Sequence, residues 1–136
     1  MTTLDSFTNL ELDQIASKLK IKNYIPCRMK NELVGKQASE VENGIIGSNN
    51  SDESDTANHW TLYYKDNDKR IYYSSFGDHI SNEIKNYLGT PILTSDIQIP
   101  TFDGIDKQAC GAYCLIILYL LSNDIPFEDI IIFLMP

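Results

Sequence analysis

The feature that most constrains the fold is an apolar segment near the end of the chain, which reads CGAYCLIILYLL over residues 110–121. Its longest uninterrupted apolar stretch, residues 114–121, is much shorter than the roughly 20 residues that cross a bilayer. A short and uniformly apolar segment is typical of a helix inside a globular core. We therefore expect residues 109–121 to form a helix that is buried on all sides.

The two cysteines of this segment are predicted to differ in chemistry. Cys110 lies in the expected first turn, where unpaired backbone N–H groups and the positive end of the helix dipole favour a thiolate. Gly111 has no Cβ, so we expect a substrate backbone to approach closely there. Cys114 lies one turn further along and is expected to be an inert core thiol. From this segment alone, a purely structural thiol at position 110 remains an alternative, since free cysteines are common in cores.

Length and composition favour one soluble domain. The chain has 136 residues, of which 43% are hydrophobic, and this suits a single core spanning residues 1–136. It carries 19 acidic and 11 basic residues, a net charge of −8, so direct binding to a nucleic-acid backbone is disfavoured. The N-terminus has no basic and apolar leader, and three cysteines do not suggest a disulfide framework. We expect an intracellular protein in a reducing compartment.

Hydrophobic periodicity predicts an alternation of helices and short strands. Thr8 and Glu11 have the spacing of a capping box at the start of a helix over residues 9–20. The other expected elements are short strands at residues 23–27 and 43–47, a hairpin of residues 59–65 and 70–76, a helix within residues 78–89, a strand at residues 91–100 and a last helix from Pro126. This order predicts an α+β domain with a small, mostly antiparallel sheet packed against the buried helix.

A thiolate nucleophile requires a base, and the chain has two histidines, His59 and His79. His59 opens the aromatic strand, where the sheet fixes its backbone while its ring can reach a neighbouring helix terminus. It is therefore the better candidate, although a structural histidine remains the alternative. His79 is expected to be exposed. A zinc site made of both histidines with Cys110 and Cys114 is conceivable, but two cysteines on one helix lack the usual ligand spacing.

The ordered set of motifs resembles the adenovirus-type maturation cysteine proteases. The motifs are His59-Trp60 at the start of an aromatic strand, YSSFG at residues 73–77, a short helix ending in Tyr-Leu, an Ile-Gln strand and CGAYC at residues 110–114. The segment IPCRMKNEL at residues 25–33 is similar to the family's Met-Arg-Asp-Glu-Leu segment. These proteases belong to the clan that includes the SUMO proteases, and the sequence looks closest to the forms of virophages and polinton-like elements.

The resemblance implies a papain-like cysteine protease fold and assigns roles to individual residues. Cys110 would be the nucleophile, His59 its general base and Gln98 the side-chain donor to the oxyanion. Trp60 would be a wall of the active site or an ordinary core residue. The implied activity is endopeptidase cleavage of viral structural precursor proteins, at small-residue sites, through a thioester.

Two positions depart from the family pattern. The family has an acidic residue two positions before the Phe of Phe-Gly, where it orients the histidine, whereas this chain has Ser74. Asp78 would replace the acid only if the strand end bends. The spacing between Gln98 and Cys110 is longer than usual, which leaves Gln108 as a second candidate for the oxyanion donor.

Two further functions stay open. Ser74 favours a catalytically weak binding module that recognises an extended peptide. The other is an acyltransferase or a deconjugase of ubiquitin-like proteins, since related folds use the same Cys–His pair on other acyl groups. We expect no cofactor, no metal and no membrane contact, a monomeric state, and a location in the host cytoplasm, the virus factory or the virion. An activating peptide that adds a strand to the sheet edge is a further possible partner.

Overall fold

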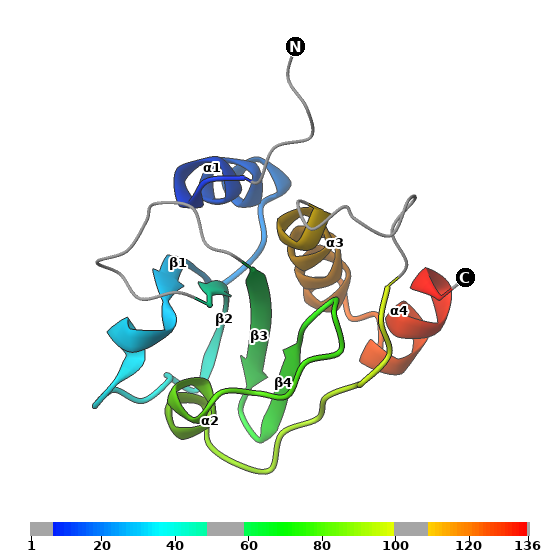
Figure 1. Ribbon diagram of the computed structural model, residues 1–136. Coiled ribbons are helices and arrows are strands. Elements are labelled where there is room, and N and C mark those ends of the chain that lie inside the picture. Colours follow the sequence, from blue (N-terminus) through cyan, green and yellow to red (C-terminus); the bar gives the residue numbers. More distant parts are fainter. Residues whose placement is uncertain (1–6, 49–58, 100–108, 136) are drawn as a thin grey trace.

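The computed structural model describes residues 7–48, 59–99 and 109–135. Figure 1 shows a twisted sheet with helices on both faces. The elements, in chain order, are α1 (Asn9–Leu19), β1 (Tyr24–Met29), the 3₁₀-helix η1 (Lys30–Leu33), β2 (Val41–Gly47), β3 (Trp60–Asp66), β4 (Lys69–Tyr73), α2 (Asn82–Leu88), α3 (Cys110–Ser122) and α4 (Phe127–Leu134). The α+β prediction is confirmed, and η1 was not anticipated.

The four strands form one mixed sheet in the order β1-β2-β3-β4. The pairs β2–β3 and β3–β4 are antiparallel, whereas β1 runs parallel to β2. The predicted hairpin is confirmed as β3 and β4, which turn at Asn67 with a left-handed φ of 55°. The sheet is therefore mostly antiparallel, as expected, with one parallel edge strand.

Alternating side chains on the strands build two cores, one on each face of the sheet. On one face, residues such as Ile45, Leu62 and Ile71 pack with α1, α3 and α4. On the other face, Ile46 and Tyr63 pack with η1 and α2. The larger core contains α3, so the helix that begins with Cys110 lies directly against the central strand β3.

Helix α3 confirms the predicted position, but the expectation that it is buried on all sides is wrong. Ile116 and Tyr119 are 43% and 40% exposed, because one face of the helix points away from the sheet and from α1 and α4. Uniform apolarity removed the periodic signal that would have identified this face. Among the described residues, no helix combines the length and apolarity that a membrane crossing requires.

The predicted strand at residues 91–100 is also wrong for the part that the structure describes. Only Leu93 pairs with the sheet, through hydrogen bonds with Arg70 and Tyr72 at the edge of β4. The alternating apolar residues instead anchor an extended segment, in which the Tyr73 hydroxyl donates to the Ile97 carbonyl. The helix expected within residues 78–89 begins only at Asn82, because Ser81 is its N-cap.

Candidate active site

Cys110 begins α3 beside the start of β3. It is 3% exposed, and the backbone N–H of Trp60 donates to its Sγ across 3.3 Å. The antiparallel register of β3 and β4 pairs Leu62 with Tyr73, so the end of β4 lies beside the start of β3. Figure 1 shows the first turn of α3 next to the start of β3. The starts of β3 and α3, which are distant in the sequence, therefore meet at the sulfur, and the end of β4 lies beside β3.

Gly111 has a different role from the one predicted. A Cβ at this position would lie 3.0 Å from Cδ2 of Leu12 and 3.4 Å from Cδ1 of Trp60. The space next to Gly111 is thus filled by α1 and β3, and the expectation of substrate approach there is wrong. The glycine instead allows α1 to pack closely on α3.

Cys114 is a core thiol, as its position in the helix predicted. It is 3% exposed, and its Sγ donates a long hydrogen bond of 3.5 Å to the Trp60 carbonyl. Burial, together with the nearby sulfurs of Cys110 and Cys27, raises the pKa of Cys114 well above its ordinary value. A thiol with so high a pKa is a poor nucleophile at neutral pH.

His59 lies just before β3 and is 8% exposed. Its carbonyl accepts a hydrogen bond from the N–H of Ser48, which fixes the backbone. The imidazole stacks on Phe76 with the ring centroids 3.9 Å apart and an interplanar angle of 8°. Nε2 lies 2.7 Å from the hydroxyl oxygen of Ser74, whereas Nδ1 has no hydrogen-bond partner among the described residues. The ring is thus oriented through one nitrogen only.

The chain bends sharply after β4 and returns Asp78 to the histidine. The N–H of Gly77 donates to the Ser74 carbonyl, and Gly77 has a φ of +74°. The Ser74 hydroxyl donates to the Asp78 carboxylate across 3.4 Å, and that carboxylate lies 3.9 Å from Nε2 of His59. The carboxyl group that is missing at position 74 is therefore present nearby, from four residues further along the chain.

Burial lowers the pKa of His59 below its ordinary value of 6.5, and the negative charge of Asp78 only partly opposes this effect. At neutral pH the imidazole is therefore uncharged. A neutral imidazole is the form that accepts a proton, as a general base must.

The remaining predicted residues are distributed around this group. Trp60 is 1% exposed, and its indole N–H donates to the Phe7 carbonyl, so it is a core residue that also contacts the site. Gln98 is exposed, and its Cγ would lie 3.3 Å from a Cβ on Gly77. Its role as oxyanion donor stays a prediction. Gln108 lies outside the described residues.

His79 is exposed, as expected. It shares with His59 a pocket of about 130 Å³ on the α2 face of the sheet, which Lys30, Tyr72 and Asp78 also line. No group of three His, Cys, Asp or Glu side chains that could hold a metal ion occurs within residues 7–48, 59–99 and 109–135. The zinc site considered for the two histidines with Cys110 and Cys114 is therefore not supported.

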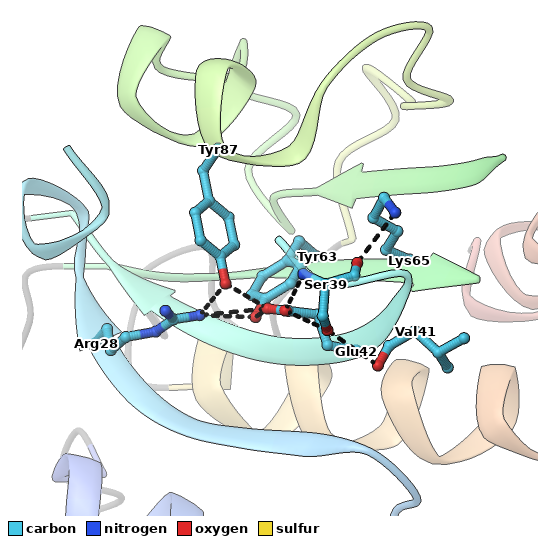
Figure 2. Close-up of polar contacts among 7 residues, drawn as sticks. All are labelled: Arg28, Ser39, Val41, Glu42, Tyr63, Lys65 and Tyr87. Carbon is cyan, nitrogen blue, oxygen red and sulfur yellow. Dashed lines mark hydrogen bonds and ion pairs between the residues drawn. The ribbon is translucent and has the colours of Figure 1, made fainter. Parts of the chain in front are cut away.

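A second buried polar cluster lies away from the sulfur, on the α2 face of the sheet. Figure 2 shows the Glu42 carboxylate between Arg28, Tyr63 and Tyr87. Both tyrosine hydroxyls donate to Glu42, whose other oxygen accepts from the N–H and the hydroxyl of Ser39. Glu42 is the second residue of β2 and lies just before the strand predicted at residues 43–47, and no local sequence pattern identified its partners.

Phe76 was another residue that the sequence did not assign to the site. Its position in the Ser-Phe-Gly turn was noted only as a motif, yet its ring stacks on the imidazole of His59. The stacking follows from the bend at Gly77, which no local pattern predicted.

Comparison with solved structures supports the fold. No protein-family model matches the sequence, and no curated protein matches it. The chain is similar to the crystal structure of ASFV pS273R protease, with a TM-score of 0.58, 12% sequence identity and 95% of this chain covered. The Se-Met form of that protease gives a TM-score of 0.59 at the same identity. The chain spans 62% of the length of these relatives. The predicted papain-like fold is thus confirmed, and the likeness to the adenovirus type in particular stays a prediction.

Proposed function

We propose that the protein is a cysteine endopeptidase in which Cys110 is the nucleophile and His59 the general base. One arrangement carries this proposal. The backbone N–H of Trp60 donates to the Sγ of Cys110, which begins α3. The residue before Trp60 is His59, whose neutral imidazole is oriented by Ser74. The fold shared with a viral protease supports the same conclusion.

In the proposed reaction, Nδ1 of His59 takes the proton of the Cys110 thiol while Sγ attacks the carbonyl carbon of the scissile peptide. The tetrahedral oxyanion accepts hydrogen bonds from the backbone N–H of Cys110 and from the side chain of Gln98. The intermediate then collapses to a thioester as His59 gives its proton to the leaving amine. Water, deprotonated by His59, hydrolyses the thioester and restores the thiol.

The substrates would be viral structural precursor proteins, cleaved after small residues in extended segments. The fold relative is described as a viral protease, which supports a viral context. Cleavage would take place in the infected cell or in the virion, where a reduced thiol persists.

The first experiment is digestion of a library of peptides from a denatured proteome, with cleavage sites identified by mass spectrometry. The wild-type chain should generate new termini with a recurring sequence. Cys110→Ala should abolish these new termini. The matched control Cys114→Ala should still generate them, because it removes only a core thiol that takes no part in the proposed reaction. Cleavage that survives Cys110→Ala, or that is absent from the wild-type chain, would contradict the proposal.

Ser74 favours one second candidate, a binding module with the same fold. A serine hydroxyl contacts His59 where the resembling family has an acid, and a neutral hydroxyl stabilises an imidazolium less than a carboxylate does. This candidate predicts that the wild-type chain and the Cys110→Ala variant bind the same peptides of the library equally well, and that neither protein cleaves them.

A further inference from the structure

Ser74 contacts three polar groups, and their chemistry decides which way its proton points. The oxygen of Ser74 lies 2.7 Å from Nε2 of His59, 3.2 Å from the N–H of Phe76 and 3.4 Å from the Asp78 carboxylate. A hydroxyl has one proton to donate and two lone pairs to accept with. The N–H of Phe76 can only donate, and an ionised carboxylate can only accept.

These constraints assign the direction of each hydrogen bond. With its proton donated to Asp78, Ser74 accepts from the N–H of Phe76 and from His59. His59 must then carry its proton on Nε2. Nδ1, which is buried and has no hydrogen-bond partner among the described residues, is left with a free lone pair.

We propose that Asp78 positions His59 through the hydroxyl of Ser74, so that the two residues together replace the directly bound acid and keep Nδ1 unprotonated. This inference rests on the proposed function for its purpose, since the unprotonated nitrogen is the one that accepts the thiol proton. Ser74 and Asp78 are positioning residues in this scheme, and neither contacts the substrate.

The local fold supports the relay. Ser74 is 1% exposed, so its hydroxyl requires protein partners, and the Asp78 carboxylate, whose side chain is 59% exposed, is an acceptor for its proton. The 3.4 Å separation is long for a hydrogen bond between oxygens, and the exposed carboxylate has room to close it as positive charge develops on the imidazole. Gly77 makes the required bend possible, since its φ is +74°.

Without Asp78, the Ser74 proton has a new acceptor available. The hydroxyl can then donate to Nε2, and the imidazole proton moves to Nδ1, which removes the lone pair needed for general-base catalysis. Loss of a carboxylate in direct contact with a catalytic histidine costs about 10⁴-fold in kcat through this change of tautomer. For a carboxylate that acts through a hydroxyl we expect a smaller loss, on the order of ten- to 100-fold, with KM little changed.

The experiment is ¹⁵N NMR of the histidine side chains, which reports tautomer and pKa whether or not any peptide is cleaved. His79→Gln assigns the two histidines. The wild-type chain should show His59 protonated on Nε2. Asp78→Ala should shift it mainly to the Nδ1-protonated tautomer and lower its pKa, because the carboxylate stabilises the imidazolium. The matched control Asp96→Ala removes an exposed acid from the segment beside Gly77 and should change neither property.

Several charged or titratable groups lie around His59, and each must be accounted for in the titration. Asp78, His79, Tyr72 and Lys30 line the same pocket as His59, and Cys110 accepts a hydrogen bond from the next residue, Trp60. All of these except Asp78 are retained in the Asp78→Ala variant. A change that Asp78→Ala produces and Asp96→Ala does not is therefore attributable to the Asp78 carboxylate.

A second variant distinguishes the relay from a direct ion pair across the 3.9 Å between Asp78 and His59. In a Ser74→Ala background the relay is already broken, so adding Asp78→Ala should leave the His59 tautomer unchanged. If Asp78→Ala alters the His59 tautomer equally with and without the Ser74 hydroxyl, or alters the tautomer in neither case, the relay is wrong. If the tautomer responds as expected while the wild-type chain cleaves no peptide, the relay stands and the proposed peptidase function fails.

Discussion

The backbone N–H of Trp60 donates a hydrogen bond to the Sγ of Cys110 across 3.3 Å. This contact links the start of β3 to the first turn of α3 at the sulfur itself. A hydrogen bond from a fixed donor stabilises a thiolate more than a thiol. The residue that precedes the donor is His59, so the same strand end carries both the donor and the candidate base.

The first prediction concerns the relative reactivity of the three cysteines. Burial raises the pKa of both Cys27 and Cys114 above the ordinary value, the first despite a hydrogen bond with the Tyr24 hydroxyl. We expect iodoacetamide to label Cys110 faster than Cys27 at neutral pH, although Cys27 is the more exposed thiol. Labelling is followed by peptide mass spectrometry.

His59→Ala should slow the labelling of Cys110 and leave the rate at Cys27 unchanged, which makes Cys27 an internal control. Equal rates at Cys110 and Cys27, or a Cys110 rate indifferent to His59, would argue against an activated thiol and favour the binding module.

The second prediction concerns the bend at Gly77. A Cβ there would lie 2.4 Å from the Asp96 carbonyl oxygen, and the φ of +74° is itself unfavourable for other residues. Gly35 has a similar φ of +77° but nothing within 4 Å of the same position. Gly35→Ala should therefore cost only about 1–2 kcal/mol from backbone strain, and Gly77→Ala should cost about 1–3 kcal/mol more because the backbone must move.

Urea unfolding measures both costs. Equal losses of stability in the two variants would show that the Asp96 segment does not pack on the bend. Gly77→Ala should in addition lower peptidase activity, since the bend carries Asp78.

The third prediction concerns the dependence of stability on pH. Burial holds the pKa of His59 below the unfolded value of 6.5, so the unfolded chain binds more protons as the pH falls below that value. The free energy of unfolding should therefore decrease from pH 6.5 down to the folded pKa. Urea unfolding between about pH 7.5 and pH 5 should show a smaller decrease for His59→Gln than for the wild-type chain.

His79→Gln is the matched control, because it removes the exposed histidine. It should retain the wild-type dependence. A His79→Gln profile that matches His59→Gln instead would mean that the buried imidazole does not cause the effect.

The fourth prediction concerns the cluster around Glu42, which is 5% exposed. Burial opposes ionisation of Glu42, but hydrogen bonds from Tyr63, Tyr87 and Ser39 outweigh it and lower its pKa below 4.5. Glu42→Gln leaves the Arg28 guanidinium and several donors without their shared acceptor, and we expect a loss of about 3 kcal/mol. Tyr87→Phe removes a single donor and should cost about 1 kcal/mol.

Urea unfolding near neutral pH compares the two variants. Comparable losses would mean that the carboxylate is not the centre of the cluster. Because the folded pKa is lowered, the contribution of Glu42 is present above pH 4.5 and is lost as the pH falls through the folded value.

Elements specified by neighbouring residues could be predicted. Thr8 and Glu11 form the expected capping box at the start of α1, because both partners lie within one turn. The hairpin of β3 and β4 follows from two aromatic strands around a short polar turn. The apolar run after Cys110 is long enough to require a buried helix and too short for a membrane.

Contacts between distant segments could not be predicted in this way. The alternation at residues 91–99 indicated a strand, but a strand requires a partner along its length, and only Leu93 finds one. Gly111 was assigned to a substrate because nothing local showed that Leu12 packs on it.

The candidate site shows the same division. Residue types and their order identified Cys110, His59 and Ser74 as candidates, since the chemistry of a thiol and an imidazole depends on the residue itself. The tertiary structure alone decided that Nε2 of His59 faces Ser74, that Phe76 stacks on the ring and that Asp78 returns to the serine. The physical reason is that hydrogen bonds form across a few ångströms whatever the separation along the chain, and packing against the sheet sets which groups come within that distance.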